Sequence, residues 1–339
     1  MINVIHQITE TYYFCKLMKN LFFLPLFLVL FACSESKQSL KEPYNEATLG
    51  ELLFFDPILS SDSTISCASC HKPEFAFADN VALSKGVNGR TGNRNAPSAM
   101  NLEARNFMFW DGRNETMEEQ ALGPIENPLE MNLPVSELIN RLYKHQQYLS
   151  FFEKIYGEKP SRKTIAAAIA AFERTLETSD TPFDAYMQRD DTSGFGVSEQ
   201  RGQDIFNHKG KCFDCHFGPD FTGDQFRNIG LFNGKDLNDS GRYIVTRKPT
   251  DIGRFKTPGL RNIAITAPYM HNGMHKTLRE VIDYYDEPDK FISNSVNRDT
   301  LLKKPLGLTE TEKKDLENFL LSLTDKRFRK KDPAKTQSR

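Results

Sequence analysis

Two copies of one short motif constrain this chain more than any other feature of its 339 residues. The motif reads C-x-x-C-H, the pattern of c-type haem attachment, in which both thiols bond to the porphyrin and the imidazole binds the iron. A chain that carries it twice is expected to fold around two flat, apolar cofactors. The residues of the two copies are Cys67, Cys70, His71, Cys212, Cys215 and His216.

Other interpretations of C-x-x-C fit this sequence less well. A zinc site needs two cysteine pairs that can share one ion, commonly about 15–20 residues apart. Cys70 and Cys212 are far apart in the chain, and both motifs end in histidine. A thioredoxin-like dithiol is not expected to need that histidine twice. Two covalently bound haem c groups are therefore the predicted cofactors.

The N-terminus resembles an export signal. Met18 begins a short basic start, the apolar run Leu21–Ala32 follows, and Cys33 stands at the junction as in a bacterial lipoprotein lipobox. The run is too short for a transmembrane helix, which needs about 20 residues. We expect a leader over 1–32 whose true start is Met18, lipid on Cys33 and a flexible tether over 33–45.

This interpretation accounts for all six cysteines. Cys15 falls in the leader, Cys33 takes the lipid, and the other four belong to the haem motifs, so none is left for a disulfide. The protein would lie in the periplasm, anchored through lipid to a bacterial membrane.

The composition is that of a globular protein, with 39% hydrophobic and 26% charged residues. Its formal net charge of −1 offers no basic surplus that would favour a nucleic-acid partner. We therefore expect no nucleic acid among its partners.

Helical periodicity surrounds both motifs. Segment 161–177 is a strong helix, a helix capped by Ser198 precedes the second motif, and Thr309 with Glu312 forms a capping box late in the chain. The apolar positions of the expected helices recur at helical spacing. They are Leu49, Leu52, Leu53, Ile165, Ile169, Phe172, Leu176, Leu316, Phe319, Leu320 and Leu323.

The duplicated motif and these helices predict a mainly α fold of two cytochrome c-like domains, each with one covalently bound c-type haem. We expect an N-terminal domain over 46–184, a C-terminal domain over 195–326 and a polar tail over 327–339. A turn-rich stretch over 180–196 would join the two domains.

Blocks of sequence in a fixed order carry a resemblance to a known family. They read "LGELLFFDPILSSDSTISCASCHKPEFAFAD", "GNRNAPSAMN", "FWDGRNETMEEQALGPIENPLEM", "KGKCFDCH" and "FKTPGLRNIAITAPYMHNGMHKTLREVIDYY", and together they span about residues 47–325. The chain resembles the bacterial di-haem cytochrome c peroxidases, which include the MauG-type enzymes. The resemblance implies that the N-terminal haem reacts with hydrogen peroxide and that the C-terminal haem passes electrons to it or shares oxidising equivalents with it.

The same resemblance implies roles for three residues in the W-D-G-R block and after it. Trp110 would relay electrons between the haems, although a lone tryptophan before a turn is otherwise a core anchor. Glu130 would be the catalytic acid and base, although the residue alone suggests a solvated loop acid. Gln120 would hydrogen-bond the peroxide. The neighbouring Glu118, Glu119 and Glu126 are interpreted as surface charge.

The resemblance also implies a calcium ion between the domains. Asn95 in "RNAP" and Thr266 with Pro268 in "ITAP" match the family's site, which uses the side-chain and backbone oxygens that calcium prefers. The alternative is that "RNAP" is only a turn that ends at a proline.

Two departures bear on the subtype. The resemblance implies that the classical family members, which need reductive activation, carry a distal histidine at the position of Val87 and a methionine at the position of Tyr285. Tyr285 is thus the expected second ligand of the C-terminal haem, as in MauG-type enzymes. The alternative ligands are Tyr284, Met270 and Met274. The place of His271 in a family block implies that it lines this haem, whereas His208 and His275 are expected to be ordinary polar or packing residues.

These observations predict a di-haem c-type peroxidase that reduces hydrogen peroxide with electrons from a small redox protein, either a cytochrome c or a cupredoxin. One alternative is a MauG-like oxidase that uses peroxide to modify a partner protein. Another is a non-catalytic electron-transfer cytochrome. Such a carrier would keep six ligands on both irons, whereas the expected iron beside Glu130 has no sixth ligand, which argues against this alternative. The sequence is compatible with either a monomer or a homodimer.

Overall fold

The computed structural model describes residues 40–329, and those from Glu42 onward belong to one compact unit. The predicted leader, the proposed start at Met18 and the lipidation site Cys33 lie outside the described residues, as do most of the tether and most of the tail. No helix within 40–329 is long and apolar enough to cross a membrane.

The described part of the chain is mainly helical, as predicted. Its sheet is a ribbon of two short antiparallel strands, β1 (Phe226–Arg227) and β2 (Phe255–Lys256). The α-helices are α2 (Glu46–Phe55), α3 (Met117–Glu126), α4 (Val135–Lys144), α5 (Gln146–Tyr156), α6 (Arg162–Glu173), α7 (Pro182–Arg189), α8 (Val197–Asn207), α9 (Tyr243–Thr246), α10 (Leu278–Asp286), α11 (Pro288–Phe291) and α12 (Glu310–Ser322).

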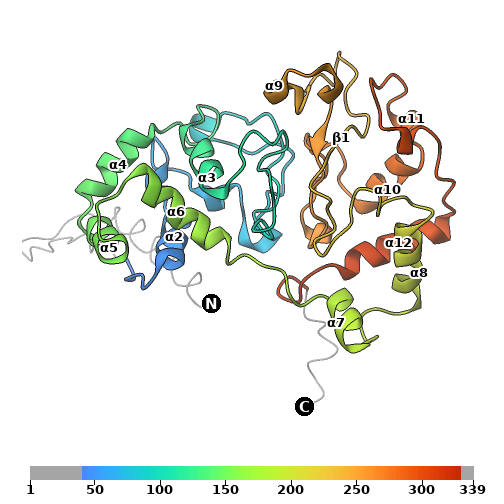
Figure 1. Ribbon diagram of the computed structural model, residues 1–339, viewed down its shortest axis with the longest axis horizontal. Coiled ribbons are helices and arrows are strands. Elements are labelled where there is room, and N and C mark those ends of the chain that lie inside the picture. Colours follow the sequence, from blue (N-terminus) through green and yellow to red (C-terminus); the bar gives the residue numbers. More distant parts are fainter. Residues whose placement is uncertain (1–39, 330–339) are drawn as a thin grey trace, which may run out of the picture. The chain divides into compact units, whose positions relative to one another are not determined.

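Helices α2 and α6 form a closely packed pair in the first half of the unit (Figure 1). A methyl group on Gly50 of α2 would run into the Ala168 carbonyl and the Phe172 side chain of α6. The two backbones therefore approach this closely only because Gly50 has no Cβ. The predicted apolar face of α6 is buried, at Ile165, Ile169, Phe172 and the following Leu176.

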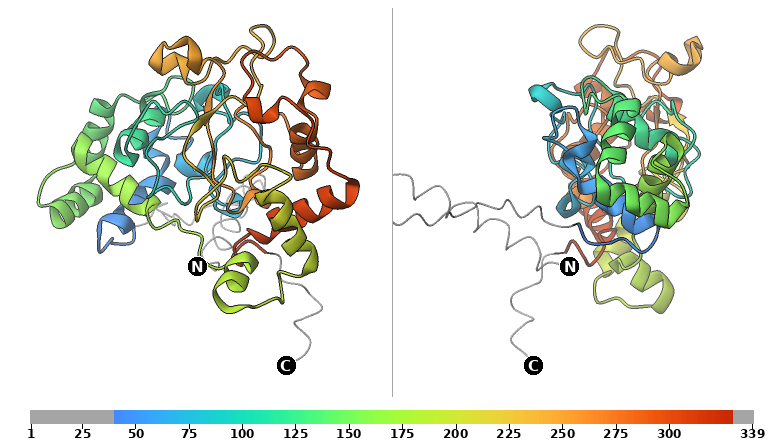
Figure 2. Two further views of the ribbon diagram at one scale, coloured as in Figure 1. Left: turned by 45° about the vertical axis from the view of Figure 1, so that its right-hand side comes forward. Right: turned by 90° about the vertical axis from the view of Figure 1, so that its left-hand side faces the viewer.

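Helices α8 and α12 form an equivalent pair in the second half (Figures 1 and 2). A methyl group on Gly202 of α8 would run into the Asp315 carbonyl and the Phe319 side chain of α12. In each half, then, the helix before the C-x-x-C-H motif crosses a later helix through a glycine. The predicted stripe of α12 is buried, at Leu316, Phe319, Leu320 and the following Leu323.

One predicted helix cap is confirmed and another is wrong. Thr309 and Glu312 form the capping box of α12, in which each side chain accepts the backbone N–H of the other residue. Ser198 does not cap α8, because that helix begins at Val197 and its N-cap is Gly196. Ser198 lies in the first turn and donates instead to the Asp315 carboxylate of α12 at 2.5 Å.

The segment expected to be turn-rich contains helix α7. The Thr181 side chain accepts the Asp184 N–H at its start, and Pro182 occupies a first-turn position, where the fixed φ of proline suits a helix. The Arg261 guanidinium donates to both oxygens of Asp184 at 2.9 and 3.0 Å. This segment is therefore tied to the second half of the chain.

Partly buried ion pairs join residues far apart in sequence. Arg105 donates to Asp220 at 2.6 Å. Arg94 donates to Asp239 at 2.6 and 2.8 Å and to Asp111 at 2.7 Å. These charge-assisted pairs fix the loops that line the cavities described next.

Candidate functional site

The first C-x-x-C-H motif lies at the wall of a cavity of about 830 Å³. Cys67–Ser69 form one tight turn, and the Nδ1 atom of His71 lies 3.0 Å from the Phe77 carbonyl oxygen. Because a carbonyl oxygen only accepts, Nδ1 carries the proton and Nε2 keeps its lone pair. Burial lowers the pKa of His71, which favours the neutral ring that binds metals.

The second motif repeats this arrangement at a second cavity. The Nδ1 atom of His216 lies 2.9 Å from the Phe221 carbonyl oxygen, and burial lowers the pKa of this ring as well. Cys212 and Cys215 line the second cavity, whereas Cys70 and His71 line the first. The two motifs thus lie at two separate sites rather than around one shared ion.

Both sites have the chemistry that a covalently bound haem requires. All four cysteines are free thiols, and burial raises their pKa values. Each pair precedes a histidine whose carbonyl partner fixes the tautomer, a common device for orienting a metal-binding imidazole. The first cavity is also within the usual size range of ligand sites, about 300–1,000 Å³.

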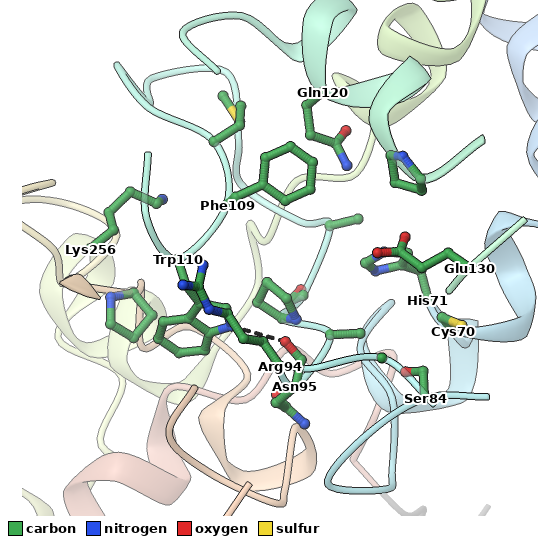
Figure 3. A pocket seen from close by; sticks show the side chains of 18 of the residues that line it. Cys70, His71, Ser84, Arg94, Asn95, Phe109, Trp110, Gln120, Glu130 and Lys256 are labelled. Atoms are coloured by element: carbon green, nitrogen blue, oxygen red, sulfur yellow. Dashed lines mark hydrogen bonds between the residues drawn. The ribbon is translucent and has the colours of Figure 1, made fainter. Parts of the chain in front are cut away.

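Gln120 and Glu130 line the first cavity together with His71, as Figure 3 shows. Gln120 lies on α3, and Glu130 lies in the turn after that helix. Within the described residues, the buried Oε1 atom of Gln120 has no hydrogen-bond partner. A buried acceptor without a partner is uncommon, so this oxygen is open to a donor in the cavity.

Two residues that the sequence analysis did not single out, Asn127 and Arg113, influence the pKa of Glu130. The Asn127 Nδ2 atom donates to the Glu130 Oε1 atom at 2.7 Å. Burial raises the pKa of Glu130, while the positive charge of Arg113 and the Asn127 hydrogen bond oppose that rise. Asn127 stands three residues before Glu130 in the same sequence block, and this proximity could have identified it as a partner of Glu130.

The loop that contains Val87 is fastened to the turn that contains Glu130. The Val87 N–H donates to the Glu130 carbonyl at 2.9 Å, and the Arg90 Nη1 atom donates to the Pro128 carbonyl at 2.7 Å. A methyl group on Gly86 would run into the backbone of Leu129 and Glu130. Val87 itself is fully buried, and the loop brings no histidine to the cavity.

Trp110 lines both cavities and so belongs to the wall that separates them. Its Nε1 atom donates to the Asn95 carbonyl at 2.9 Å (Figure 3). Its own carbonyl accepts the Lys256 N–H at 2.8 Å, which ties it to strand β2. A ring held in this way has a fixed orientation between the two sites.

Aromatic contact continues from Trp110 toward the second cavity. The His271 ring meets Trp110 edge-on with 6.5 Å between ring centroids, and it stacks on Phe255 at 3.7 Å. Both residues line the second cavity, as expected for His271. Phe255 was missed, because only the pairing of β1 with β2 brings it here.

The residues considered as further ligands of the second haem occupy different positions. Tyr285 and Met270 line the cavity with His216. The Tyr284 hydroxyl instead donates to the Ile229 carbonyl at 2.6 Å, and Met274 is partly exposed. Burial raises the pKa of Tyr285, so a phenolate there would need a positive partner such as a metal.

The three proposed calcium residues all line the second cavity. Asn95 lines both cavities, and Thr266 and Pro268 line the second. The Asn95 Nδ2 atom donates to the Val81 carbonyl at 3.1 Å. This leaves the Oδ1 atom of Asn95 as the side-chain atom that a cation would use.

Residues expected to be outside the site lie outside it. His208 is exposed, and its ring bonds to the Asp204 carbonyl of its own helix. His275 is buried in contact with Tyr284 and Phe291. The expected surface acids are exposed or partly exposed, and two of them form ion pairs, one with Arg162 of α6 and one with Arg174 directly after that helix. These acids are Glu118, Glu119 and Glu126.

Comparison with known proteins agrees with this geometry. The family described as di-haem cytochrome c peroxidase matches residues 44–192. The cytochrome-c peroxidase IdrP1 of Denitromonas iodatirespirans is 34% identical over 314 residues, which cover 83% of this chain and 82% of that protein. This chain belongs to the di-haem cytochrome c peroxidase family. Its membership makes it an oxidoreductase of the cytochrome c peroxidase type and implies haem c as the cofactor.

The family contains relatives of both expected kinds. The methylamine utilization protein MauG of Methylorubrum extorquens is 35% identical over 282 residues, covering 82% of this chain and 78% of that protein. A solved MauG-like protein associated with microbial copper homeostasis has a TM-score of 0.75 at 32% identity and covers 85% of this chain and 93% of its own.

Proposed function

We propose that this family member is a di-haem peroxidase that reduces hydrogen peroxide to water with electrons from a small redox protein. One observation carries the proposal. A single cavity brings together His71, with an available Nε2, and the side chains of Glu130 and Gln120. A ligand for iron, an acid–base carboxyl and an unpartnered hydrogen-bond acceptor therefore face one space.

His71 would hold the haem of the first cavity, bonded through Cys67 and Cys70. When bound, this haem supplies an iron that takes peroxide as a ligand and exchanges electrons with it. Glu130 takes the proton from the near oxygen of peroxide and returns it to the far oxygen as that oxygen leaves. The Gln120 carbonyl accepts a hydrogen bond from the peroxide and orients it.

His216 and Tyr285 would hold the haem of the second cavity, bonded through Cys212 and Cys215. Electrons would enter there from a cytochrome c or a cupredoxin and reach the first cavity through the shared wall. Trp110 is the proposed relay, because its ring borders both cavities and its Nε1 hydrogen bond fixes its position.

A MauG-like oxidase of a partner protein is the second candidate. Tyr285 in the second cavity, together with Val87 at the position of the activating histidine, favours it. The two candidates share the site and differ in the source of electrons, which is a small donor in one and a protein substrate in the other.

We also propose a domain organisation, a calcium site and a lipid anchor for this protein. The crossings of α2 with α6 and of α8 with α12 support two cytochrome c-like domains over 46–184 and 195–326. Asn95, Thr266 and Pro268 would hold one calcium ion. Lipid on Cys33 would anchor the protein in the periplasm, either as a monomer or as a homodimer.

The deciding experiment is peroxide turnover by the purified diferric protein, with and without a reduced small cytochrome c. The peroxidase proposal expects direct reaction with peroxide and rapid turnover only with the donor. Reaction with peroxide but no faster turnover with any small donor would favour the oxidase. No reaction with peroxide would leave an electron-transfer cytochrome.

A further inference from the structure

Glu173 is a buried acid that the mechanism above does not use. It ends helix α6, its residue is 4% exposed, and it lines the first cavity with His71, Gln120 and Glu130. Within residues 40–329, its buried Oε2 atom has no hydrogen-bond partner. Buried carboxyl oxygens are nearly always paired, so an unpaired one at the wall of a reaction cavity calls for a functional explanation.

The surroundings of Glu173 favour a neutral carboxyl. The adjacent Arg174, which is partly exposed, donates to Glu103 and Glu118 at 2.7 and 2.8 Å. Burial raises the pKa of Glu173 to about 8, a rise that Arg174 opposes and Glu118 supports. The nearby Cys67 thiol, whose pKa burial raises, would be a neutral thioether once haem is attached.

The remaining neighbours of α6 do not change this conclusion. Helices α2 and α4 also pack against α6, and no charged group on either of them shifts the pKa of Glu173. Glu173 therefore holds a proton at neutral pH and gives it up in the mildly alkaline range.

The reaction needs such a proton. Reduction of hydrogen peroxide consumes two electrons and two protons and yields two waters. Glu130 moves a proton from one oxygen of peroxide to the other, so the first water leaves without any net proton from the protein. The second oxygen then takes up two electrons from the donor and two protons before it leaves as water. Nothing in the assignment of Glu130 supplies those two protons.

We propose that Glu173 is the proton donor for the second half of the reaction in the first cavity. Each time an electron arrives from the reduced donor protein, the Glu173 O–H bond breaks, the proton goes to the remaining oxygen, and the carboxylate regains a proton from solvent. Two such transfers deliver the two electrons and two protons that turn this oxygen into the second water. This assignment rests on the proposed function and adds a second acid to the same site. Glu130 serves the cleavage of peroxide, and Glu173 serves the reductive phase.

The test separates the two phases in the diferric holoprotein. Stopped-flow mixing with hydrogen peroxide follows the first phase, and a second mixing with reduced small cytochrome c follows the return to the resting spectrum. Glu173→Gln should slow the return by about 10²-fold, the lower end of what a positioned general acid contributes, and should slow the first phase far less. In the wild type, the return should slow as pH rises through about 8, and the variant should lack this dependence.

An infrared pH titration gives a readout apart from turnover. The wild type should have a band of a protonated carboxyl that disappears as pH rises through about 8, and Glu173→Gln should lack it. Glu126→Gln is the matched control, since Glu126 is a glutamate at the end of the neighbouring helix α3 that is exposed and paired with Arg162. Glu173→Asp, which keeps the acid one carbon shorter, should restore part of the return rate and its pH dependence.

The outcomes distinguish this assignment from the proposed function. If the wild type reacts with peroxide while Glu173→Gln keeps both the return rate and its pH dependence, the assignment fails and the peroxidase proposal stands. If Glu173→Asp loads both haems but is no faster than Glu173→Gln, a packing role replaces the proton donor. A wild type that carries both haems and ignores peroxide overturns the assignment and the proposed function together.

Discussion

Opposing effects act on the pKa of Glu130, and this suits a carboxyl that must both take and return a proton. Burial favours its protonated form, and Arg113 and Asn127 favour its ionised form. Glu130→Gln keeps the shape and removes the base. It should keep both haems and lose peroxide reactivity by about 10²–10⁴-fold in stopped-flow measurements. An unchanged rate would return Glu130 to the role of an ordinary loop acid.

Asn127 gives a second prediction at this scale, with a definite sign. Its hydrogen bond stabilises the ionised form of Glu130, so Asn127→Ala should raise the pKa of Glu130 further. Because the ionised form is the base, the acidic limb of the pH–rate profile should move to higher pH. Asn140→Ala, which removes an exposed amide on α4, should leave the limb in place. An unchanged acidic limb in Asn127→Ala would mean that this hydrogen bond does not affect the pKa of Glu130.

At the scale of elements, each C-x-x-C-H motif follows a helix that crosses a later helix closely at a glycine. Gly50→Ala and Gly202→Ala should each destabilise the protein by about 1–3 kcal/mol or more, because the added methyl meets a backbone carbonyl that cannot move aside. Gly92→Ala is the control, since a methyl there would meet only atoms 3.9 Å away or more. Denaturant unfolding of the holoprotein measures the difference. Equal stability of Gly50→Ala and Gly92→Ala would contradict the close crossing.

The elements themselves were largely predictable, because helical periodicity is a local property. The apolar faces of α6 and α12 and the capping box at Thr309 follow from residues a few positions apart. Ser198 was misassigned because its partner, Asp315, is on another helix. Helix α7 was missed because its proline and threonine, typical of turns, also start helices.

At the scale of the whole molecule, the sequence located the cavity residues but not the contacts that bring them together. The haem motifs, Glu130 and Trp110 stand in recognisable blocks, so their types and order could be read directly. The pairing of Arg94 with Asp239 and the stacking of Phe255 on His271 depend on chain segments far apart in sequence. Glu173 looks like one more surface acid of a helix until the fold buries it.

The second ligand of the C-terminal haem influences the reduction potential of that haem. Tyr285 lines the second cavity and Tyr284, its neighbour, is bonded to the Ile229 carbonyl. If the Tyr285 oxygen binds the second iron, the potential of that haem should be low, and Tyr285→Met should raise it, because a methionine ligand favours the reduced iron. Redox titration of the holoprotein measures the shift.

Tyr284→Phe is the control for this substitution, since it removes a hydroxyl of the same kind one residue away without touching the cavity lining. It should leave the potential of the second haem near the wild-type value. A higher potential in Tyr285→Met alone makes Tyr285 the ligand and places the chain with the MauG-type members. Equal potentials in Tyr285→Met and the wild type would exclude Tyr285 and turn attention to Met270, the other candidate in that cavity.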